Sequence, residues 1–318
     1  MASHDTNHEP PLQAYLELVR LPNLFTAMAD VAMGVLFVQA VATRADLLRL
    51  ASLACASALL YAAGVVLNDV VDLKVDARQR PGRPLPSGRV SPQMARWLAV
   101  QLLLAGAAVA WLVSFLLGHL GPGVVATALV GCILAYDLLL KRTPLGPVAM
   151  GGCRMLNVML GMSVAAGPWQ TDIWHTGHWL VASAVGVYIT GITWFARTEA
   201  TYSNRLSLTL AAGVMLGGIA MLASLPRAMA GLPPGFRVDP QRWQLLMGVL
   251  GALIGWRFLR AIVEPAAPRV QVAVKQGILS LVILDAAVCY ATRGMQPAVA
   301  VLLLLLPATM LGRRIAST

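Results

Sequence analysis

The stretch Leu47–Asn68, LLRLASLACASALLYAAGVVLN, runs directly into the acidic stretch Asn68–Asp76, NDVVDLKVD. The first stretch is long enough to cross a bilayer, which takes roughly 20 apolar residues as an α-helix. The second places three aspartates at the end of that run, in a chain that has only 14 acidic residues. Together they predict a membrane helix that carries an acidic cluster at one surface of the bilayer.

Composition extends this interpretation to the whole chain. Hydrophobic residues make up 58% of the 318 residues and charged residues 12%, whereas a soluble domain has about 25% charged residues. Mean hydropathy is +0.71. The short alternating segments that build transmembrane β-barrels are not visible in the sequence. We therefore expect an all-α, polytopic transmembrane bundle.

Apolar runs recur along the chain and predict nine or ten crossings, because the last two runs are short. We expect one transmembrane domain at residues 22–312, between an N-terminal cytoplasmic segment (1–21) and a short tail (313–318). The predicted spans are Pro22–Val41, Leu47–Asn68, Ala95–Leu117, Val124–Leu140, Leu145–Ala166, Trp179–Phe195, Leu206–Leu225, Leu245–Val263, Gly277–Tyr290 and Gln296–Leu311.

Basic residues are unevenly divided between the two ends of this bundle. If the N-terminus is cytoplasmic, 17 lysines and arginines fall in cytoplasmic connections and 6 in outer ones. Cytoplasmic loops carry an excess of basic residues. We therefore expect a multi-pass protein of a bacterial inner membrane, with its N-terminus and the acidic cluster on the cytoplasmic face. This topology also explains the net charge of +10, so we expect no nucleic-acid partner. The sequence does not identify a protein partner.

The acidic cluster has a spacing that suits a divalent cation. If the helix continues past Asn68, its three aspartates lie three and four residues apart on one face. Mg²⁺ takes a few carboxylate oxygens and fills its other positions with water and substrate phosphate. The alternative is a solvated helix end whose acids pair with neighbouring bases. The predicted metal ligands in this stretch are Asn68, Asp69, Asp72 and Asp76.

A stiff basic segment follows the acidic cluster. The segment Arg80–Arg89, RPGRPLPSGR, contains three prolines and two glycines. A guanidinium such as that of Arg83 can bind phosphate oxygens in pairs. By itself the segment would be a basic loop that sets topology. Beside three aspartates it favours an anion site, and the pair Lys141 and Arg142 at the end of a later span could contribute to it.

Three charged residues lie inside apolar runs. A charge such as that of Arg154 costs roughly 2.5 kcal/mol or more within a membrane helix. We therefore expect Arg154 to face the bundle interior, with a diphosphate or an aspartate as its partner. Asp30 and Asp285 raise the same question, and each is a candidate partner for Arg154.

The motifs resemble a known family. Asn68–Asp76 followed by Arg83–Gly88 (RPLPSG) is similar to the first signature of UbiA-type intramembrane prenyltransferases. Tyr136–Arg142 (YDLLLKR), Gly152–Asn157 (GCRMLN) and Arg20–Asn23 (RLPN) extend the resemblance over most of the chain. The resemblance implies a multi-helix bundle that uses Mg²⁺ to transfer an allylic prenyl group from a diphosphate to a lipophilic, often aromatic, acceptor.

One part of the sequence departs from the family pattern. The family predicts a second motif, commonly Asp-x-x-x-Asp, after the sixth span, but Ala196–Arg205 contains one carboxylate, that of Glu199. Glu199 and Ser203 are four residues apart and could share a helix face. We predict that Glu199 is a weaker metal ligand or accepts the proton of the acceptor. The sequence of Ala196–Ala200 (ARTEA) resembles that of the EboC-like branch of the family.

These observations predict a membrane enzyme that cleaves a prenyl diphosphate and passes the prenyl group to a lipophilic acceptor. Asp76 and Glu199 are the predicted catalytic residues. The alternatives are a transporter or carrier of an anionic lipid or metabolite, and a catalytically degenerate member that binds an isoprenoid. The residues predicted to bind substrate are Arg83, Tyr136, Lys141, Arg142, Arg154 and Asn157.

Overall fold

The computed structural model describes residues 11–165, 174–197, 204–231 and 235–314. Over these ranges the chain is helical, and 10 helices or helix pairs are long and apolar enough to cross a membrane. The prediction of an all-α polytopic bundle is confirmed, and the choice between nine and ten crossings falls on ten for the described residues. The elements are α1 (Pro11–Leu18), α2 (Leu21–Val38), α3 (Arg44–Val71), α4 (Leu73–Gln79), α5 (Pro92–Leu117), α6 (Gly121–Ala135), η1 (Tyr136–Leu140), α7 (Gly146–Met162), η2 (Ser163–Ala165), α8 (Thr176–Ala196), α9 (Arg205–Ala223), α10 (Leu225–Ala228), α11 (Pro240–Val263), α12 (Ala267–Arg293), α13 (Met295–Leu302) and α14 (Leu305–Arg314).

Several of these helices begin and end where local chemistry dictates. Thr43 and Asp46 form a capping box at the start of α3, which satisfies backbone N–H groups that have no partner within the helix. The hydroxyl of Ser91 accepts a bond from the Met94 N–H at the start of α5, and Gly118 ends that helix at φ 71°. A left-handed glycine is a common helix terminator because it has no Cβ to clash.

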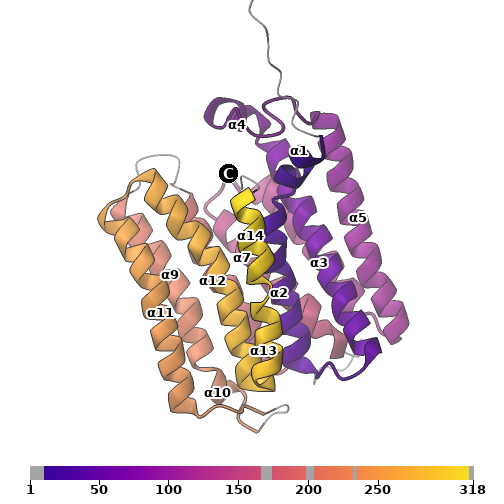
Figure 1. Ribbon diagram of the computed structural model, residues 1–318, viewed down its shortest axis with the longest axis vertical. Coiled ribbons are helices and arrows are strands. Elements are labelled where there is room, and N and C mark those ends of the chain that lie inside the picture. Colours follow the sequence, from indigo (N-terminus) through magenta and orange to yellow (C-terminus); the bar gives the residue numbers. More distant parts are fainter. Residues whose placement is uncertain (1–10, 166–173, 198–203, 232–234, 315–318) are drawn as a thin grey trace, which may run out of the picture.

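Successive spans run in opposite directions, so the bundle has two ends. The name aspartate end is used here for the end at which α3 meets α4, with Asp69, Asp72 and Lys141 close together. Figure 1 shows α4 at the top of the bundle and α10 at the bottom. Helices α6, α8 and α11 finish at the aspartate end, and α7, α9 and α12 start there.

Helix α2 is the centre of the bundle. It contacts α3, α7, α12 and α14, and 67% of its span is buried, against 22% for α5 and for α11. Figure 1 shows α2 between the N-terminal helices α3 and α5 on one side and α9 and α11 on the other. A charged side chain on α2 therefore needs a partner within the protein.

Glycines let the central helices approach closely. A Cβ on Gly161 of α7 would lie 2.2 Å from the carbonyl oxygen of Val31 on α2, and a Cβ on Gly34 would lie 2.4 Å from that of Val158. Membrane helices use small residues in this way, because close backbone contact replaces the hydrophobic driving force that lipid removes. These contacts set α7 against α2 and thereby position the polar residues of both helices.

Candidate active site

The acidic stretch is divided by a helix break. Helix α3 ends at Val71, Asp72 adopts φ −90° and ψ 3°, and α4 begins at Leu73. The expectation that one continuous helix carries all three aspartates on a single face is therefore wrong. The break turns Asp69 and Asp76 toward one group of basic residues and Asp72 toward another.

Arg83 lies between two aspartates. Its Nη1 atom is 2.7 Å from Asp76 Oδ2 and 3.5 Å from Asp69 Oδ1. Asp69 also accepts a bond of 2.9 Å from Nη2 of Arg20. The side chains of Arg83, Asp69 and Asp76 are at most 8% exposed. Two carboxylates thus converge on one positive group in a nearly dry environment.

Burial and the two aspartates shift the pKa of Arg83 in opposite directions. Burial, followed by the positive charge of Arg20, lowers the pKa of the Arg83 guanidinium, while Asp69 and Asp76 raise it. An arginine has a pKa so high that it stays protonated in proteins. Arg83 therefore remains a cation held against the two carboxylates.

Arg20 has an unusual backbone. Its φ of 48° is left-handed, and it is the sole non-glycine residue with positive φ among the described residues. Such a conformation is uncommon for a residue with a Cβ and tends to cluster at functional sites. Here it sits directly before α2, where the chain turns and the guanidinium reaches Asp69.

A second cluster surrounds Asp72. The Nζ atom of Lys141 is 2.6 Å from Asp72 Oδ2 and donates to the Asn68 carbonyl at 3.3 Å. The Asn68 side chain donates to Asp137 Oδ1 at 3.0 Å. Arg142 is more peripheral, 3.5 Å from Asp72 with a side chain 67% exposed. Lys141 therefore joins the end of the α6 span to the end of α3.

A π-helical turn places Lys141 there. Tyr136–Leu140 forms η1, in which the Lys141 N–H bonds to the Tyr136 carbonyl at 2.8 Å. A π turn holds one residue more than an α turn and often occurs at functional sites. The extra residue changes the direction in which the following side chains point. Tyr136 is half-buried and Asp137 is buried in this turn.

Arg197 and Gly146 hold the turn that follows. Nη2 of Arg197, at the end of α8, donates to the Lys141 carbonyl at 2.6 Å and also to the Thr143 carbonyl. A Cβ on Gly146 would lie 2.8 Å from that Lys141 carbonyl and 2.9 Å from Arg197 Nη2. Only a residue without a side chain fits there, so Gly146 leaves room for the guanidinium that fixes the turn.

Arg154 and Asn157 lie deeper in the bundle. Arg154 is eight residues into α7, about 12 Å along the helix. Its Nη1 is 2.7 Å from Asp30 Oδ2, and its guanidinium carbon lies 5.0 Å from the centre of the Tyr61 ring. Asn157 donates to the same Asp30 oxygen at 3.2 Å and accepts from Ser57 at 2.7 Å. The expectation that Arg154 has an aspartate partner is confirmed.

Asp285 completes this buried network from α12. Its carboxyl group is 1% exposed and lies against that of Asp30. Neither oxygen of Asp285 receives a donor from the described residues, and the same holds for Oδ1 of Asp30. One arginine thus faces two carboxyl groups in the interior of a membrane protein.

The carboxylates at the aspartate end fit a Mg²⁺ ion that takes its remaining ligands from water and substrate. No three acidic, histidine or cysteine side chains among the described residues form a ready-made metal cluster. Mg²⁺ is commonly bound through one or two carboxylates, with water and substrate phosphates as its other ligands. Asp69 and Asp76 both face the same cationic group, Arg83, so two carboxylates are close enough together to serve one cation.

The structure brings most of the predicted residues together at the aspartate end and leaves some apart. Asn68, Asp69, Asp72, Asp76, Arg83, Tyr136, Lys141 and Arg142 gather there, in the clusters described above. Arg154 and Asn157 belong to the deeper network. Glu199 and Ser203 lie outside the described residues, and so does the segment that resembles the EboC-like branch.

Three contributors were not among the predicted site residues. Arg20 could have been identified from the RLPN motif at the start of the first span. Asp137 could have been identified from its position four residues before Lys141, which places both residues on one helix face. Arg197 carried no distinctive signal, because a basic residue at a helix end also serves topology.

The fold and the site define a multi-pass membrane protein that holds carboxylates and basic side chains at one end of a helical bundle. The sequence model of the UbiA prenyltransferase family matches residues 27–274. The chain belongs to the UbiA prenyltransferase family, and the resemblance drawn from its motifs is confirmed.

Curated relatives match part of the chain. It is 35% identical over 167 residues to a digeranylgeranylglyceryl phosphate synthase of Ignicoccus hospitalis, covering 51% of this chain and 50% of that protein. It is 34% identical over 165 residues to the protein of the same name from Methanopyrus kandleri, covering 50% and 57%. The chain thus spans about half the length of these curated relatives.

Solved structures share the fold over nearly the whole chain. A UbiA homologue from Archaeoglobus fulgidus bound to GPP and Mg²⁺ aligns with a TM-score of 0.63 at 13% identity, over 91% of this chain and 99% of that one. A structure of digeranylgeranylglyceryl phosphate synthase aligns with a TM-score of 0.61 at 18% identity, over 90% and 100%. At these identities the shared feature is the bundle.

Proposed function

We propose that this protein transfers a prenyl group from an allylic prenyl diphosphate to a lipophilic acceptor within the membrane, with Mg²⁺ as its cofactor. The observation that carries the proposal is the meeting of opposite charges at the aspartate end. Asp69, Asp72 and Asp76 each contact at least one of four basic side chains, which are those of Arg20, Arg83, Lys141 and Arg142.

These contacts describe a site ready for both a cation and an anion. Grouped carboxylates repel one another unless positive groups join them, and here the positive groups are arginines and a lysine. When bound, Mg²⁺ would supply positive charge to the diphosphate as the carbon–oxygen bond breaks. Asp69, Asp76 and Asn68 are the residues that would hold it, with Asp72 as a further ligand.

The basic residues then have a role of their own. Arg83 and Lys141 would bind the diphosphate oxygens and stabilise the charge that develops on the leaving group. Lys141 is suited to this because the π turn and Arg197 fix its position before substrate arrives. A donor held in advance needs little reorganisation during the reaction, which is why preorganised charge contributes so much to catalysis.

The acceptor is a lipophilic molecule. The curated relatives are named digeranylgeranylglyceryl phosphate synthases, which makes a glycerophosphate-type lipid one acceptor to test beside aromatic ones. We retain the prediction that Glu199 accepts the acceptor's proton or assists a second metal ion. We propose that Tyr136, which begins the turn that carries Lys141, contacts the donor.

The membrane setting follows from the same proposal. The aspartate end carries the basic connections that the charge asymmetry assigns to the cytoplasm. We therefore propose that the N-terminus and the site face the cytoplasm of a bacterial inner membrane. The site would then lie at the face of the membrane from which aqueous Mg²⁺ arrives, while the bundle would provide an apolar path for the isoprenoid.

The experiment uses purified protein in lipid nanodiscs with radiolabelled prenyl diphosphates and candidate acceptors, with Mg²⁺ or with a chelator. We expect metal-dependent diphosphate release that Asp72→Ala abolishes. Asp46→Asn removes a carboxylate from the opposite end of the same helix and should retain activity. Release that survives Asp72→Ala would contradict the site assignment.

The same assay separates the enzyme from its alternatives. A transporter would move an anionic lipid or metabolite across liposomes without releasing diphosphate, an activity that the buried charges of Arg154 and Asp30 could serve. A degenerate family member would bind a prenyl diphosphate without turnover. If no diphosphate is released or bound under any condition, the proposed function fails.

A further inference from the structure

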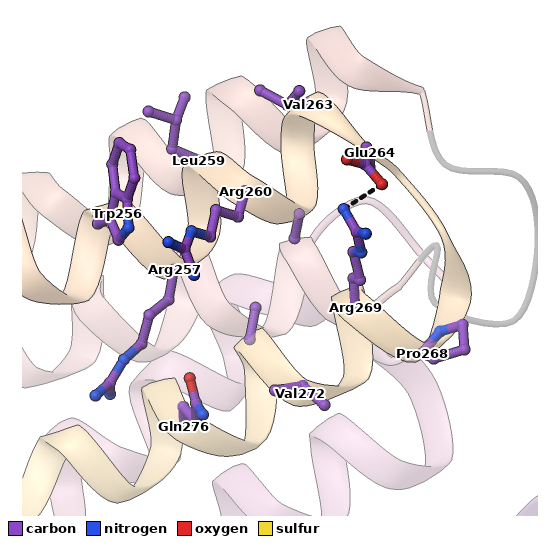
Figure 2. Close-up of a pocket in the computed structure, with 12 residues that line it drawn as sticks. Trp256, Arg257, Leu259, Arg260, Val263, Glu264, Pro268, Arg269, Val272 and Gln276 are labelled. Atoms are coloured by element: carbon purple, nitrogen blue, oxygen red, sulfur yellow. Dashed lines mark ion pairs between the residues drawn. The ribbon is translucent and has the colours of Figure 1, made fainter.

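A groove lies between α11 and α12 at the aspartate end. Its volume is about 800 Å³, and Figure 2 shows side chains from both helices around it. On α11 these include Arg257 and Arg260, and on α12 they include Arg269 and Gln276. None of the groove residues belongs to the candidate active site, so the groove requires its own explanation.

The groove has a positive charge. Three arginines and one glutamate line it, which leaves a formal excess of two positive charges. Glu264 is taken by Arg269, as the dashed line in Figure 2 marks. Arg257 and Arg260 form no ion pair with any carboxylate in the described part of the chain. The protein therefore supplies two exposed guanidinium groups without an anion.

These arginines lie on a membrane-spanning helix. Arg257 and Arg260 fall within the last two turns of α11, whose span runs from Pro240 to Val263. Charged side chains near a helix end direct their charged groups toward the interface. Arg260 lies over the Trp256 ring at 5.1 Å, and tryptophan favours the level of lipid headgroups. The groove is thus placed where phospholipid phosphates are found.

Apolar side chains border the charged ones. Trp256 is 54% exposed, Leu259 47%, Val263 56% and Val272 54%. Water solvates these exposed apolar side chains unfavourably. Beside a phospholipid, the apolar surface meets acyl chains while the arginines meet the headgroup. Trp256, Arg260 and Val263 of α11 are four and three residues apart, so apolar and charged side chains share one face of that helix.

A further arginine lies beside the end of α11. Arg205 of α9 donates to the Val263 carbonyl at 3.0 Å. That contact brings another arginine close to the end of the groove.

We propose that this groove binds the phosphate headgroup of an anionic phospholipid from the surrounding bilayer. Arg257 and Arg260 hold the phosphate, and an acyl chain lies along Leu259 and Val272. Basic pockets between membrane helices recognise anionic headgroups by the same combination of charge and apolar contact. The site tethers α11 to α12 and does not depend on the function proposed above.

Native mass spectrometry of the full-length protein, released from detergent with defined lipids, tests this proposal. We expect wild-type protein to retain phosphatidylglycerol in preference to phosphatidylcholine. The double variant Arg257→Gln, Arg260→Gln should bind phosphatidylglycerol about thirtyfold more weakly, which corresponds to roughly 2 kcal/mol at 1.4 kcal/mol per tenfold. Arg44→Gln with Arg242→Gln removes two exposed arginines at the opposite end and should change nothing.

Two further measurements keep the result interpretable. Arg260→Lys preserves the charge and should lose only part of the affinity, because a lysine cannot bind two phosphate oxygens in a fixed fork. Phosphatidylglycerol should raise the Tm of wild-type protein in detergent, and inorganic phosphate alone should not. Equal retention of both lipids by wild-type protein, unchanged binding by the double variant, or the same Tm rise with inorganic phosphate would each overturn the proposal.

Discussion

Nη1 of Arg154 lies 2.7 Å from Oδ2 of Asp30, and this contact joins α7 to the central helix α2 across 124 residues of sequence. Both side chains are buried. A buried pair is a poor guide to net stability, because desolvation offsets the attraction. The loss of one partner is a different matter, since it leaves the other charge without compensation.

Arg154→Met should therefore destabilise the protein strongly. The substitution leaves Asp30 facing Asp285 with no cation between helices, and we expect a loss of about 3–5 kcal/mol in the free energy of unfolding. Thermal unfolding in detergent measures it. Arg96→Met, at an exposed position, should stay within about 0.5 kcal/mol of wild type. Equal Tm values for the two variants would contradict the role assigned to the pair.

Asp285→Asn should behave in the opposite way. Asp30 Oδ1 and both Asp285 oxygens are acceptors that receive no donor from the described residues. An amide at position 285 can donate to Asp30, and a buried hydrogen bond to a charged group contributes about 1.5–3 kcal/mol. We expect a Tm equal to or above that of wild type. A fall as large as that of Arg154→Met would show that the carboxyl group itself is needed.

Lys141→Gln tests the basic side of the site. Its Nζ is 2.6 Å from Asp72 and its side chain is 9% exposed, so the lost charge has no substitute from solvent. We expect diphosphate release to fall about 10²-fold, the usual effect of removing one preorganised stabilising group. Arg142→Gln is the matched control, because that side chain is 67% exposed and should cost less than about tenfold. Similar losses for both variants would mean that charge alone, without placement, accounts for the effect.

Gly146→Ala tests the positioning of Lys141 without touching it. The new methyl group would lie 2.8 Å from the Lys141 carbonyl and 2.9 Å from Arg197, so the turn must shift. We expect reduced diphosphate release and a stability loss of about 1–3 kcal/mol. Gly131→Ala has open space around the new methyl and should be neutral or slightly stabilising. Arg197→Gln should reproduce the activity loss; full activity in both Gly146→Ala and Arg197→Gln would exclude the positioning role.

The spans could be predicted from the sequence because length and apolarity decide them. The predicted run Leu47–Asn68 corresponds to α3, at Arg44–Val71. Apolarity does not reveal where a helix bends, so the break at Asp72 was not predicted. The residues Asp69–Asp76 are compatible with a continuous helix, and it is the contacts with Arg83 and Lys141 that accompany the break.

The buried network around Arg154 could be predicted in part, from a different argument. A charge inside an apolar run predicts a partner, and that argument pointed correctly from Arg154 to an aspartate. It could not choose between Asp30 and Asp285, since both lie in apolar runs and the choice depends on how α2 and α12 pack. The π turn at Tyr136 was also beyond prediction, because five residues carry the same helix signal whether the turn is α or π.

Asp30 enters the membrane before its partner has been made. Arg154 follows it by 124 residues, which takes roughly 6–25 s at a synthesis rate of 5–20 residues per second. During that interval the aspartate of the first span lacks its arginine, and the pair forms when α7 packs against α2. A nascent chain that stops before Arg154 therefore holds a carboxylate without its cation inside the bilayer, and a membrane helix bears a free-energy cost for such a charge.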